Sequence, residues 1–233
     1  MSTDRPSSSH GLMQFLRQVP LFAGLGEPAL NRLAQASHLR RIPAGFVLFN
    51  QGDAGTAAYI VRSGSITIVV NTPDGHELVL NDMRAGDCFG EMSLVADLPR
   101  SASAIAGQAS EVVVIPRVEF LNQLSGEPRL ARRVMETLCR RLGSSAERES
   151  ALAFLHAPAR LARVLLELDR EGSARGFLTV SQEELSRRAG ITRQTTVKIL
   201  ARWRRGQWVM TGRGKIMLLN RAAIRQESSA ESG

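Results

Sequence analysis

Hydrophobic positions follow two different periods along this chain. Apolar side chains recur at helical steps over residues 12–16 and 30–34, which predicts two short helices near the start. From Leu39 the pattern changes to short β-rich runs separated by glycine and proline turns, at residues 46–49, 57–61, 65–70, 77–81, 103–106 and 111–115. Many short strands at such spacing predict a barrel or sandwich. Residues 71–76, around Pro73-Asp74-Gly75, predict a hairpin connection.

A long helix is predicted after the β-rich segment. Pro116 and Pro128 each fit the first turn of a helix, and a stripe of small or apolar residues follows Pro128 at helical steps. The stripe consists of Leu130, Val134, Leu138, Leu142, Ser145 and Leu152. About 25 helical residues extend about 40 Å, which is longer than a small domain covers. We therefore expect part of the stripe to pack on the chain's own β-domain and the rest on a second copy in a two-fold dimer.

Residues 154–158 interrupt the helical pattern. Pro158 favours an extended Ala157 and a new helix behind it, so we interpret this segment as a hinge between domains. The expected core face of the new helix consists of Leu161, Val164, Leu165 and Leu168.

Beyond the hinge the sequence predicts a helix-turn-helix. Ser181 and Glu184 have the spacing of a capping box, so a short helix follows and ends at Ala189. A tight turn at Gly190-Ile191-Thr192 leads into a second helix over residues 193–205, with Thr192 as its N-cap. Strands at residues 208–210 and 215–218 predict a two-stranded wing, and residues 226–233 predict a polar tail.

The second helix has one apolar and one polar face. Thr196, Ile199, Leu200 and Trp203 can face the core, and we expect Trp203 and Trp208 to pack there rather than stack on bases. Polar and cationic side chains at the start of such a helix are placed to meet base edges. The residues expected to contact DNA are Thr192, Arg193, Gln194, Thr195, Lys198 and Arg202.

Charge separates the same two parts of the chain. Residues 1–155 carry 15 basic and 15 acidic side chains, whereas residues 156–225 carry 15 basic and 5 acidic ones, a net charge of +10. Two acidic residues beyond Arg225 bring the formal net charge of the chain to +8. A neutral front and a basic rear favour a sensing part joined to a nucleic-acid-binding part.

Composition excludes several other classes of protein. Two cysteines, Cys88 and Cys139, offer neither a disulfide framework nor a zinc set, and free thiols in a reducing compartment are expected. The chain shows no apolar run of membrane-spanning length and no signal peptide, so we expect a cytoplasmic protein without a membrane partner.

The segment at residues 87–104 has the chemistry of a sugar-phosphate site. Gly90 lets backbone approach a ligand closely, Glu91 can accept hydrogen bonds from a ribose hydroxyl, and Met92 begins a short helical turn whose N–H groups suit an anion. Arg100 supplies a forked, permanently charged donor for phosphate oxygens. Ser101 adds a hydroxyl, and the small Ala102 permits backbone donation.

This run resembles the phosphate-binding cassette of cyclic-nucleotide-binding domains, in which Phe-Gly-Glu, an aliphatic and a small residue and Leu precede a short loop and Arg-Ser/Thr-Ala. Every position of that pattern is filled here. With the long helix, the hinge and the helix-turn-helix in the same order, residues 21–219 resemble the cyclic-AMP receptor protein and FNR superfamily of transcription regulators. The resemblance implies an α+β fold: an N-terminal cyclic-nucleotide-binding β-roll, a long dimerisation helix and a C-terminal winged helix-turn-helix.

The resemblance also implies roles for single residues. Glu91 would bind the ribose hydroxyl, while Arg100, Ser101, Gly90 and Ala102 would bind the cyclic phosphate, with Met92 beside them. After the basic pair Arg140-Arg141, Ser145 falls on the position that reads the adenine amino group, and Ala146 replaces a second hydroxyl of the family. Arg193, Gln194 and Lys198 fall on three DNA-reading positions at which the cyclic-AMP receptor has Arg, Glu and Arg.

The expected function is that of a dimeric transcription regulator that binds a palindromic operator under control of cyclic AMP, with RNA polymerase as a candidate protein partner. Alternatives are a regulator of the same fold that ignores nucleotides or takes another ligand, and the regulatory subunit of an enzyme. Only about 78 residues follow residue 155, and they show no catalytic constellation, so no enzyme is expected.

Neither a metal nor a haem is expected. Some haem-binding relatives use a histidine near the hairpin, but His76 lies in a turn, and the intact cassette competes with a haem site. The FNR-type N-terminal cysteine cluster is missing. The expected domains are 1–126 for the β-roll, with a disordered tail at 1–10, then 127–155 for the dimerisation helix and 156–233 for the winged helix-turn-helix.

Overall fold

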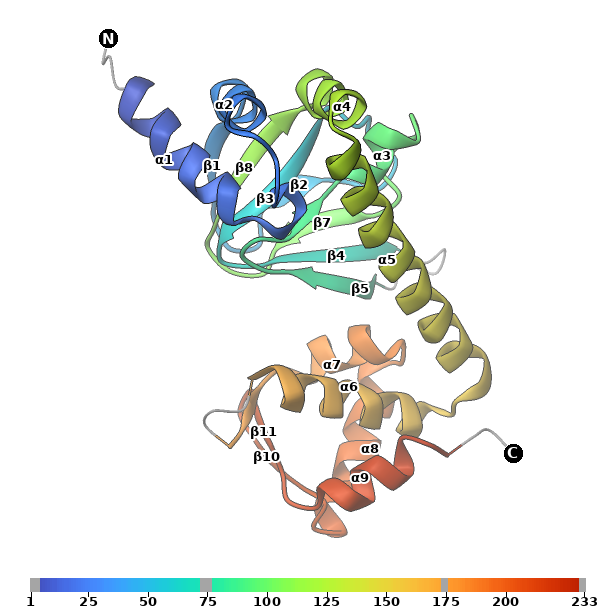
Figure 1. Ribbon diagram of the computed structural model, residues 1–233. Coiled ribbons are helices and arrows are strands. Elements are labelled where there is room, and N and C mark those ends of the chain that lie inside the picture. The colour runs from blue at the N-terminus through green and yellow to red at the C-terminus, as the bar shows by residue number, and fades with distance from the viewer. Residues whose placement is uncertain (1–4, 72–76, 173–175, 231–233) are drawn as a thin grey trace. The chain divides into compact units, whose positions relative to one another are not determined.

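The structure is a computed structural model that describes residues 5–71, 77–172 and 176–230. The chain forms two compact units, one of Met1–Asn71 and Val79–Leu142 and the other of Thr72–Leu78 and Gly143–Gly233. The elements follow the predicted order of a β-rich domain, a long helix and a helical domain with a wing (Figure 1), so the predicted α+β class is confirmed. The predicted hairpin connection and His76 lie outside the described residues.

The first unit begins with helices. They are α1 (Arg5–Gln18), a 3-10 turn (Pro20–Phe22) and α2 (Glu27–Ala36). α1 starts inside the segment expected to be a disordered tail, so this helix is longer than its apolar positions predicted.

Strands make up the centre of the first unit. They are β1 (His38–Ile42), β2 (Val47–Phe49), β3 (Ala57–Ser63), β4 (Ile66–Asn71), β5 (Glu77–Met83), β6 (Cys88–Phe89), β7 (Ser103–Ala106) and β8 (Ser110–Pro116). The described residues form two four-stranded sheets, ordered β1-β8-β3-β6 and β2-β7-β4-β5, as the sandwich prediction requires. The predicted strands are present, while β1 and β6 were not predicted.

Alternation along β3 places its side chains in two cores. Tyr59 and Val61 belong to the cluster between the sheets, whereas Ala58 and Ile60 belong to a cluster shared with the helices. Successive side chains of a strand point to opposite faces of the sheet. When both faces are covered, as for β3, successive positions are apolar instead of alternating between apolar and polar. This central strand therefore holds the helical layer and the second sheet together.

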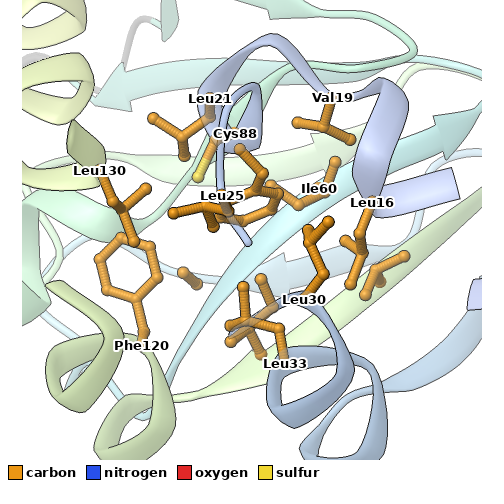
Figure 2. Packing of buried hydrophobic residues seen from close by; sticks show 14 of the residues in the cluster. Leu16, Val19, Leu21, Leu25, Leu30, Leu33, Ile60, Cys88, Phe120 and Leu130 are labelled. Carbon is orange, nitrogen blue, oxygen red and sulfur yellow. The ribbon is translucent and has the colours of Figure 1, made fainter. Parts of the chain in front are cut away.

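Helices α1, α2 and α4 (Arg117–Gly126) cover one face of the first sheet together with the start of α5 (Pro128–Phe154). Figure 2 shows this cluster, in which Phe120 of α4 lies beside Leu130 of α5. The labelled members are Leu16, Val19, Leu21, Leu25, Leu30, Leu33, Ile60, Cys88, Phe120 and Leu130. The base of the long helix is thus fixed by the hydrophobic core of the sheet domain.

The apolar stripe of α5 changes character along its length. Leu130 and Val134 are buried, 0% and 3% exposed, whereas Leu142 is 71% exposed. The start of the 27-residue helix therefore packs as predicted, Leu138 is half-buried against the same core, and Leu142 is left uncovered within the chain. None of the helices in the described part of the chain has the length and apolar character needed to span a membrane.

Only Leu155 and His156 separate α5 from α6 (Ala157–Gly172). The expectation that Ala157 is extended was wrong, because α6 begins at that residue. Pro158 lies in the first turn, where a missing N–H costs nothing. The Nδ1 atom of His156 accepts a hydrogen bond from the N–H of Ala159 at 3.0 Å and so caps the new helix.

The second unit packs α6, α7 (Gln182–Ala189) and α8 (Arg193–Arg205) around Trp203, which is 1% exposed. Ser181 caps α7 by accepting from the N–H of Glu184 at 3.0 Å, and Thr192 caps α8 by accepting from Thr195 at 3.1 Å. Gly190 ends α7 with a φ of 59°, in the left-handed region that favours glycine. These local signals place both helices where the sequence predicted them.

A three-stranded sheet completes this unit. It consists of β10 (Val209–Gly212), β11 (Lys215–Leu218) and the unpredicted β9 (Leu178–Thr179), which pairs with β11. The predicted polar tail was wrong at its start, because α9 (Arg221–Glu227) extends into it. Asn220 caps α9, and its Ile224 is fully buried, so one apolar anchor holds a polar helix on the domain.

Candidate functional site

Gly90 provides the turn that shapes the candidate ligand site. Its φ of 77° is left-handed, and a Cβ atom there would lie 2.7 Å from Nη1 of Arg100, so a larger residue would clash. Helix α3 (Glu91–Val95) begins directly behind it, one residue before the predicted start at Met92. The glycine therefore brings the start of α3 and the Arg100 guanidinium together.

Arg100 is buried, 4% exposed, and its guanidinium is surrounded by neutral acceptors. Nη1 donates to the carbonyl of Gly90 and, at 2.8 Å, to Oγ of Ser93, while Nη2 donates to the carbonyl of Ala57 at 2.7 Å. The guanidinium carbon lies 4.2 Å from the ring centre of Phe49, a cation–π contact. Burial lowers the pKa of Arg100, although arginine still remains charged.

Glu91 is the second buried charge of the site, with 2% of its surface exposed. Its Oε1 accepts a hydrogen bond from Nη1 of Arg141 on α5, and Arg141 also donates to the carbonyl of Cys88. Burial raises the pKa of Glu91, and the Arg141 guanidinium offsets part of this rise. Arg141, for which no ligand-binding role was predicted from the sequence, is thus a member of the site.

Two polar atoms of this site have no partner within the described residues. Nε of Arg100 is a buried donor, and Oε2 of Glu91 is a buried acceptor. Unpaired buried polar atoms are rare because each loses its hydrogen bonds to water without replacement. A charged donor and a carboxylate acceptor nine residues apart suit a ligand that carries both an anionic group and hydroxyls.

A cavity of about 590 Å³ opens between α5 and the chain leading into α3, within the size range of small-molecule pockets. Glu91 and Arg141 line it, together with residues of the 3-10 turn and of α5, whereas Arg100 is not among its lining residues. Glu91 therefore connects the cavity with the Arg100 turn.

The remaining predicted ligand residues have mixed surroundings. Ala102 is buried, while Ser101 and Met92 are exposed, Met92 by 45%. Ser145 lies on α5 four residues after Arg141, in the part of the chain assigned to the second unit, where its Oγ donates to Glu149 Oε1 at 3.5 Å. The structure thus brings Gly90, Glu91 and Arg100 together and adds Arg141 to them.

Helix α8 carries the candidate DNA-reading face. Arg193, Gln194, Lys198 and Arg202 are exposed, whereas the predicted core residues Thr196, Ile199, Leu200 and Trp203 are buried. Trp203 and Trp208 lie in the core with ring centres 6.2 Å apart, as expected. The polar face is therefore available to a partner, and the apolar face is fixed by the domain.

The polar side chains of α8 differ in their local partners. Nε of Arg193 lies 3.9 Å from Glu183 Oε2, a loose ion pair. Nη2 of Arg202 donates to Oε1 of Glu227 on α9 at 2.5 Å, so part of the charge of Arg202 is already neutralised. The hydroxyls of Thr192 and Thr195 lie 2.8 Å apart and take part in the helix cap.

Within the described residues, no group of three or more His, Cys, Asp and Glu side chains could hold a metal ion. Both cysteines are free, and burial raises the pKa of Cys88, which keeps this thiol protonated.

Comparison with known proteins assigns both regions. The model of the cyclic nucleotide-binding domain matches residues 39–127, and that of the Crp-like helix-turn-helix domain matches residues 159–227. The chain is 34% identical over 181 residues to the cyclic AMP receptor protein of Thermus thermophilus, and this match covers 78% of this chain and 83% of that protein. It is 28% identical to the CRP-like cAMP-activated global transcriptional regulator of Mycobacterium tuberculosis, over 89% of this chain and 95% of that one.

A solved structure extends the likeness to the fold. The regulator CLP of Xanthomonas campestris, described as c-di-GMP responsive, has a TM-score of 0.76 and 27% identity, covering 83% of this chain and 99% of its own.

Replacing Glu91 by glutamine tests the cost of burying its charge. Because burial raises the pKa of Glu91, the folded chain holds this proton more tightly than the unfolded chain. The resulting stabilisation is complete below the unfolded-state pKa and is lost as the pH rises through the folded-state pKa. We expect the free energy of unfolding of Glu91→Gln to fall less between about pH 4 and pH 7 than that of the unchanged protein, as measured by urea unfolding.

Glu136→Gln is the matched control, since it removes the same charge from a side chain that is 54% exposed on α5. Equal pH profiles for Glu91→Gln and the unchanged protein would contradict the assigned direction.

Proposed function

This chain belongs to the CRP/FNR family of DNA-binding transcription regulators, with a cyclic-nucleotide-binding domain and a helix-turn-helix domain, and we propose that cyclic AMP is the ligand that controls it. The observation that carries the proposal is the pair of unpartnered buried atoms, Arg100 Nε and Glu91 Oε2, from two residues that adjoin Gly90. A cyclic phosphate supplies the acceptors that Arg100 lacks, and a ribose hydroxyl supplies the donor that Glu91 lacks.

Binding would exchange weak partners of Arg100 for strong ones. The guanidinium now donates to carbonyl and hydroxyl oxygens, whereas hydrogen bonds between charged groups are about twice as strong as neutral ones. The Ser101 hydroxyl and the backbone of Ala102 follow Arg100 directly and would complete the phosphate site, with Met92 on its exposed side. Two of the relatives have cAMP in their names, which agrees with this ligand.

A second nucleotide is a specific alternative. The structural relative CLP responds to c-di-GMP, which also combines phosphate groups with ribose, so the Gly90–Arg100 turn alone does not choose between them. We place base selection on Ser145, where a hydroxyl would read the adenine amino group. Ala146 has no hydroxyl to add a second contact, so the base receives less support here than in the cyclic-AMP receptor pattern.

We further propose a homodimer through α5. Met135 and Leu142, which lie seven residues apart and so on one face of α5, are 58% and 71% exposed, which is costly for a single chain in water. A second copy of the same helix covers such a stripe most simply, by two-fold symmetry. In this division of the chain, residues 1–126 bind the ligand, 127–155 dimerise and 156–233 bind DNA.

The dimer would read a two-fold symmetric operator with two copies of α8. Arg193 prefers guanine, whereas Gln194 has both a donor and an acceptor and suits the N6 and N7 atoms of adenine. Lys198 can reach guanine or a phosphate as a point charge, and Thr192, Thr195 and Arg202 would support the contact to the backbone. RNA polymerase is the candidate protein partner of the bound dimer.

Arg100→Gln tests the ligand site. Losing one member of a buried charge pair costs about 2–5 kcal/mol, so cyclic AMP binding measured by calorimetry should weaken at least about tenfold. Arg41→Gln, whose side chain is 92% exposed on β1, is the control and should bind as the unchanged protein does. Calorimetry with cyclic GMP and c-di-GMP decides the ligand, and an unchanged protein that binds none of the three would defeat the proposal.

Leu142→Glu tests the dimer. A carboxylate placed on the uncovered stripe repels its symmetry mate and loses the apolar contact, so the protein should be monomeric at micromolar concentration by light scattering. Val118→Glu makes the same kind of change on α4, at a side chain that is 70% exposed, and should leave a dimer. A monomeric unchanged protein would contradict the proposal.

Gln194→Glu tests base reading. A carboxylate only accepts hydrogen bonds and suits the cytosine amino group, so selection from random DNA should change the preferred base at one symmetric pair of positions. A specific base contact contributes about 1–3 kcal/mol, which such a selection resolves. Gln207→Glu is the control, because it adds the same charge directly behind α8. Identical base preferences for Gln194→Glu and the unchanged protein would show that Gln194 does not read sequence.

A further inference from the structure

Arg160 forms an unusual set of hydrogen bonds within the second unit. It lies in the first turn of α6, and its guanidinium donates only to backbone carbonyls in the bonds that the structure shows. Nε donates to Ala189 at 3.1 Å and Nη2 to Gly190 at 3.3 Å, whereas Nη1 donates to Leu155 at 3.2 Å and to Leu152 at 3.4 Å. One side chain thus binds four carbonyls from two separate segments.

Both segments are helix ends. Leu152 and Leu155 belong to the last turn of α5 and the residue behind it, while Ala189 and Gly190 are the last residue and the C-cap of α7. The last carbonyls of a helix have no partner inside the helix and carry its partial negative charge. Arginine is suited to such a site, because its planar fork directs five N–H donors along fixed directions.

The carbonyls bound by Arg160 lie close in sequence to the start of α8, the proposed DNA-reading helix. Two residues separate α5 from α6, and only Ile191 and the cap Thr192 separate Gly190 from Arg193. Gly190 is in the left-handed region, so the turn it makes fixes how α8 leaves α7. A side chain that holds the Gly190 carbonyl therefore acts directly on the start of the DNA-reading helix.

We propose that Arg160 is a positioning residue that joins the last turn of α5 to the turn of the helix-turn-helix, so that the two segments move as one body. A displacement of α5 then reaches Arg193 and Gln194 through one guanidinium rather than through the two-residue connection alone. The consequence for the nucleotide response rests on the proposed function, whereas the joining of the two segments does not.

The contrast with Arg163 separates this role from ordinary packing. Arg163 lies on the same helix, and its Nε donates to the carbonyl of Ser228 behind α9 at 3.3 Å. It thus makes the same kind of bond to the end of a helix, without linking α5 to α7. Partial burial against these carbonyls lowers the pKa of Arg160.

Hydrogen exchange on the full-length Arg160→Gln protein, without ligand or DNA, tests whether Arg160 links the end of α5 to the turn between α7 and α8. The N–H of Leu155 donates to Ala151, and that of Ile191 donates to Ser186, so each segment has its own reporter amide. We expect exchange to accelerate at both amides together, by about tenfold or more, and at neither amide in Arg163→Gln. Acceleration at one amide alone, or at neither, would overturn the proposal.

Operator binding tests the consequence. We expect the ratio of operator affinities with and without cyclic AMP to fall at least about fivefold in Arg160→Gln. The affinity of the DNA-free variant for cyclic AMP should stay within about twofold of that of the unchanged protein. An unchanged ratio would overturn the coupling role. If the unchanged protein shows no cyclic AMP effect, the proposed function fails, and hydrogen exchange alone decides on Arg160.

Arg160→Lys provides a second variant in case the glutamine variant does not fold. Lysine keeps the charge but offers donors from a single nitrogen, so it cannot hold four carbonyls in two directions. We expect its exchange at the two amides to be faster than in the unchanged protein. Exchange equal to that of the unchanged protein would show that the charge alone suffices and would overturn the role of the fork.

Discussion

Helix α5 is longer than the sheet domain at its base covers, and this constraint links the parts of the chain. Leu130 anchors the helix in the core, Arg141 binds Glu91 three turns later, and the next residue, Leu142, is 71% exposed. Successive helical residues point about 100° apart, so Arg141 and Leu142 face different surroundings from the same turn. A ligand that changes the bond between Glu91 and Arg141 therefore acts next to the surface we propose for the partner copy.

The ligand site is maintained at a cost to the folded state. Glu91 and Arg100 are both charged groups taken out of water, and each retains a polar atom without a partner in the described residues. Such atoms cost about 1–3 kcal/mol each when they stay unpaired. The proposed ligand would pair both atoms and relieve this cost, which would give the occupied and empty states different free energies and hence a means of regulation.

Helix caps and turns were predictable from the sequence, whereas side-chain contacts between residues far apart in the chain were not. The cap Thr192, the tight turn at Gly190 and the limits of α8 were predicted correctly because their signals lie within a few residues of one another. The bond between Arg141 and Glu91 joins residues 50 positions apart, so no spacing rule reveals it. Helix α9 was missed because Ile224 is its only apolar anchor, and the ion pair of Glu227 with Arg202 depends on that missed helix.

Basic residues of the DNA-binding part can contribute in two ways, by non-specific attraction to any duplex and by specific contacts to bases. The net charge of +10 over residues 156–225 attracts any duplex and weakens with salt. Specific contacts to bases need side chains that are exposed and able to change conformation. The side chain of Arg193 is 70% exposed, whereas that of Arg202 is bound to Glu227 on α9, so Arg193 meets this condition better. In our proposal the turn held by Arg160 positions these side chains, so its loss would weaken specific binding and leave the general attraction unchanged.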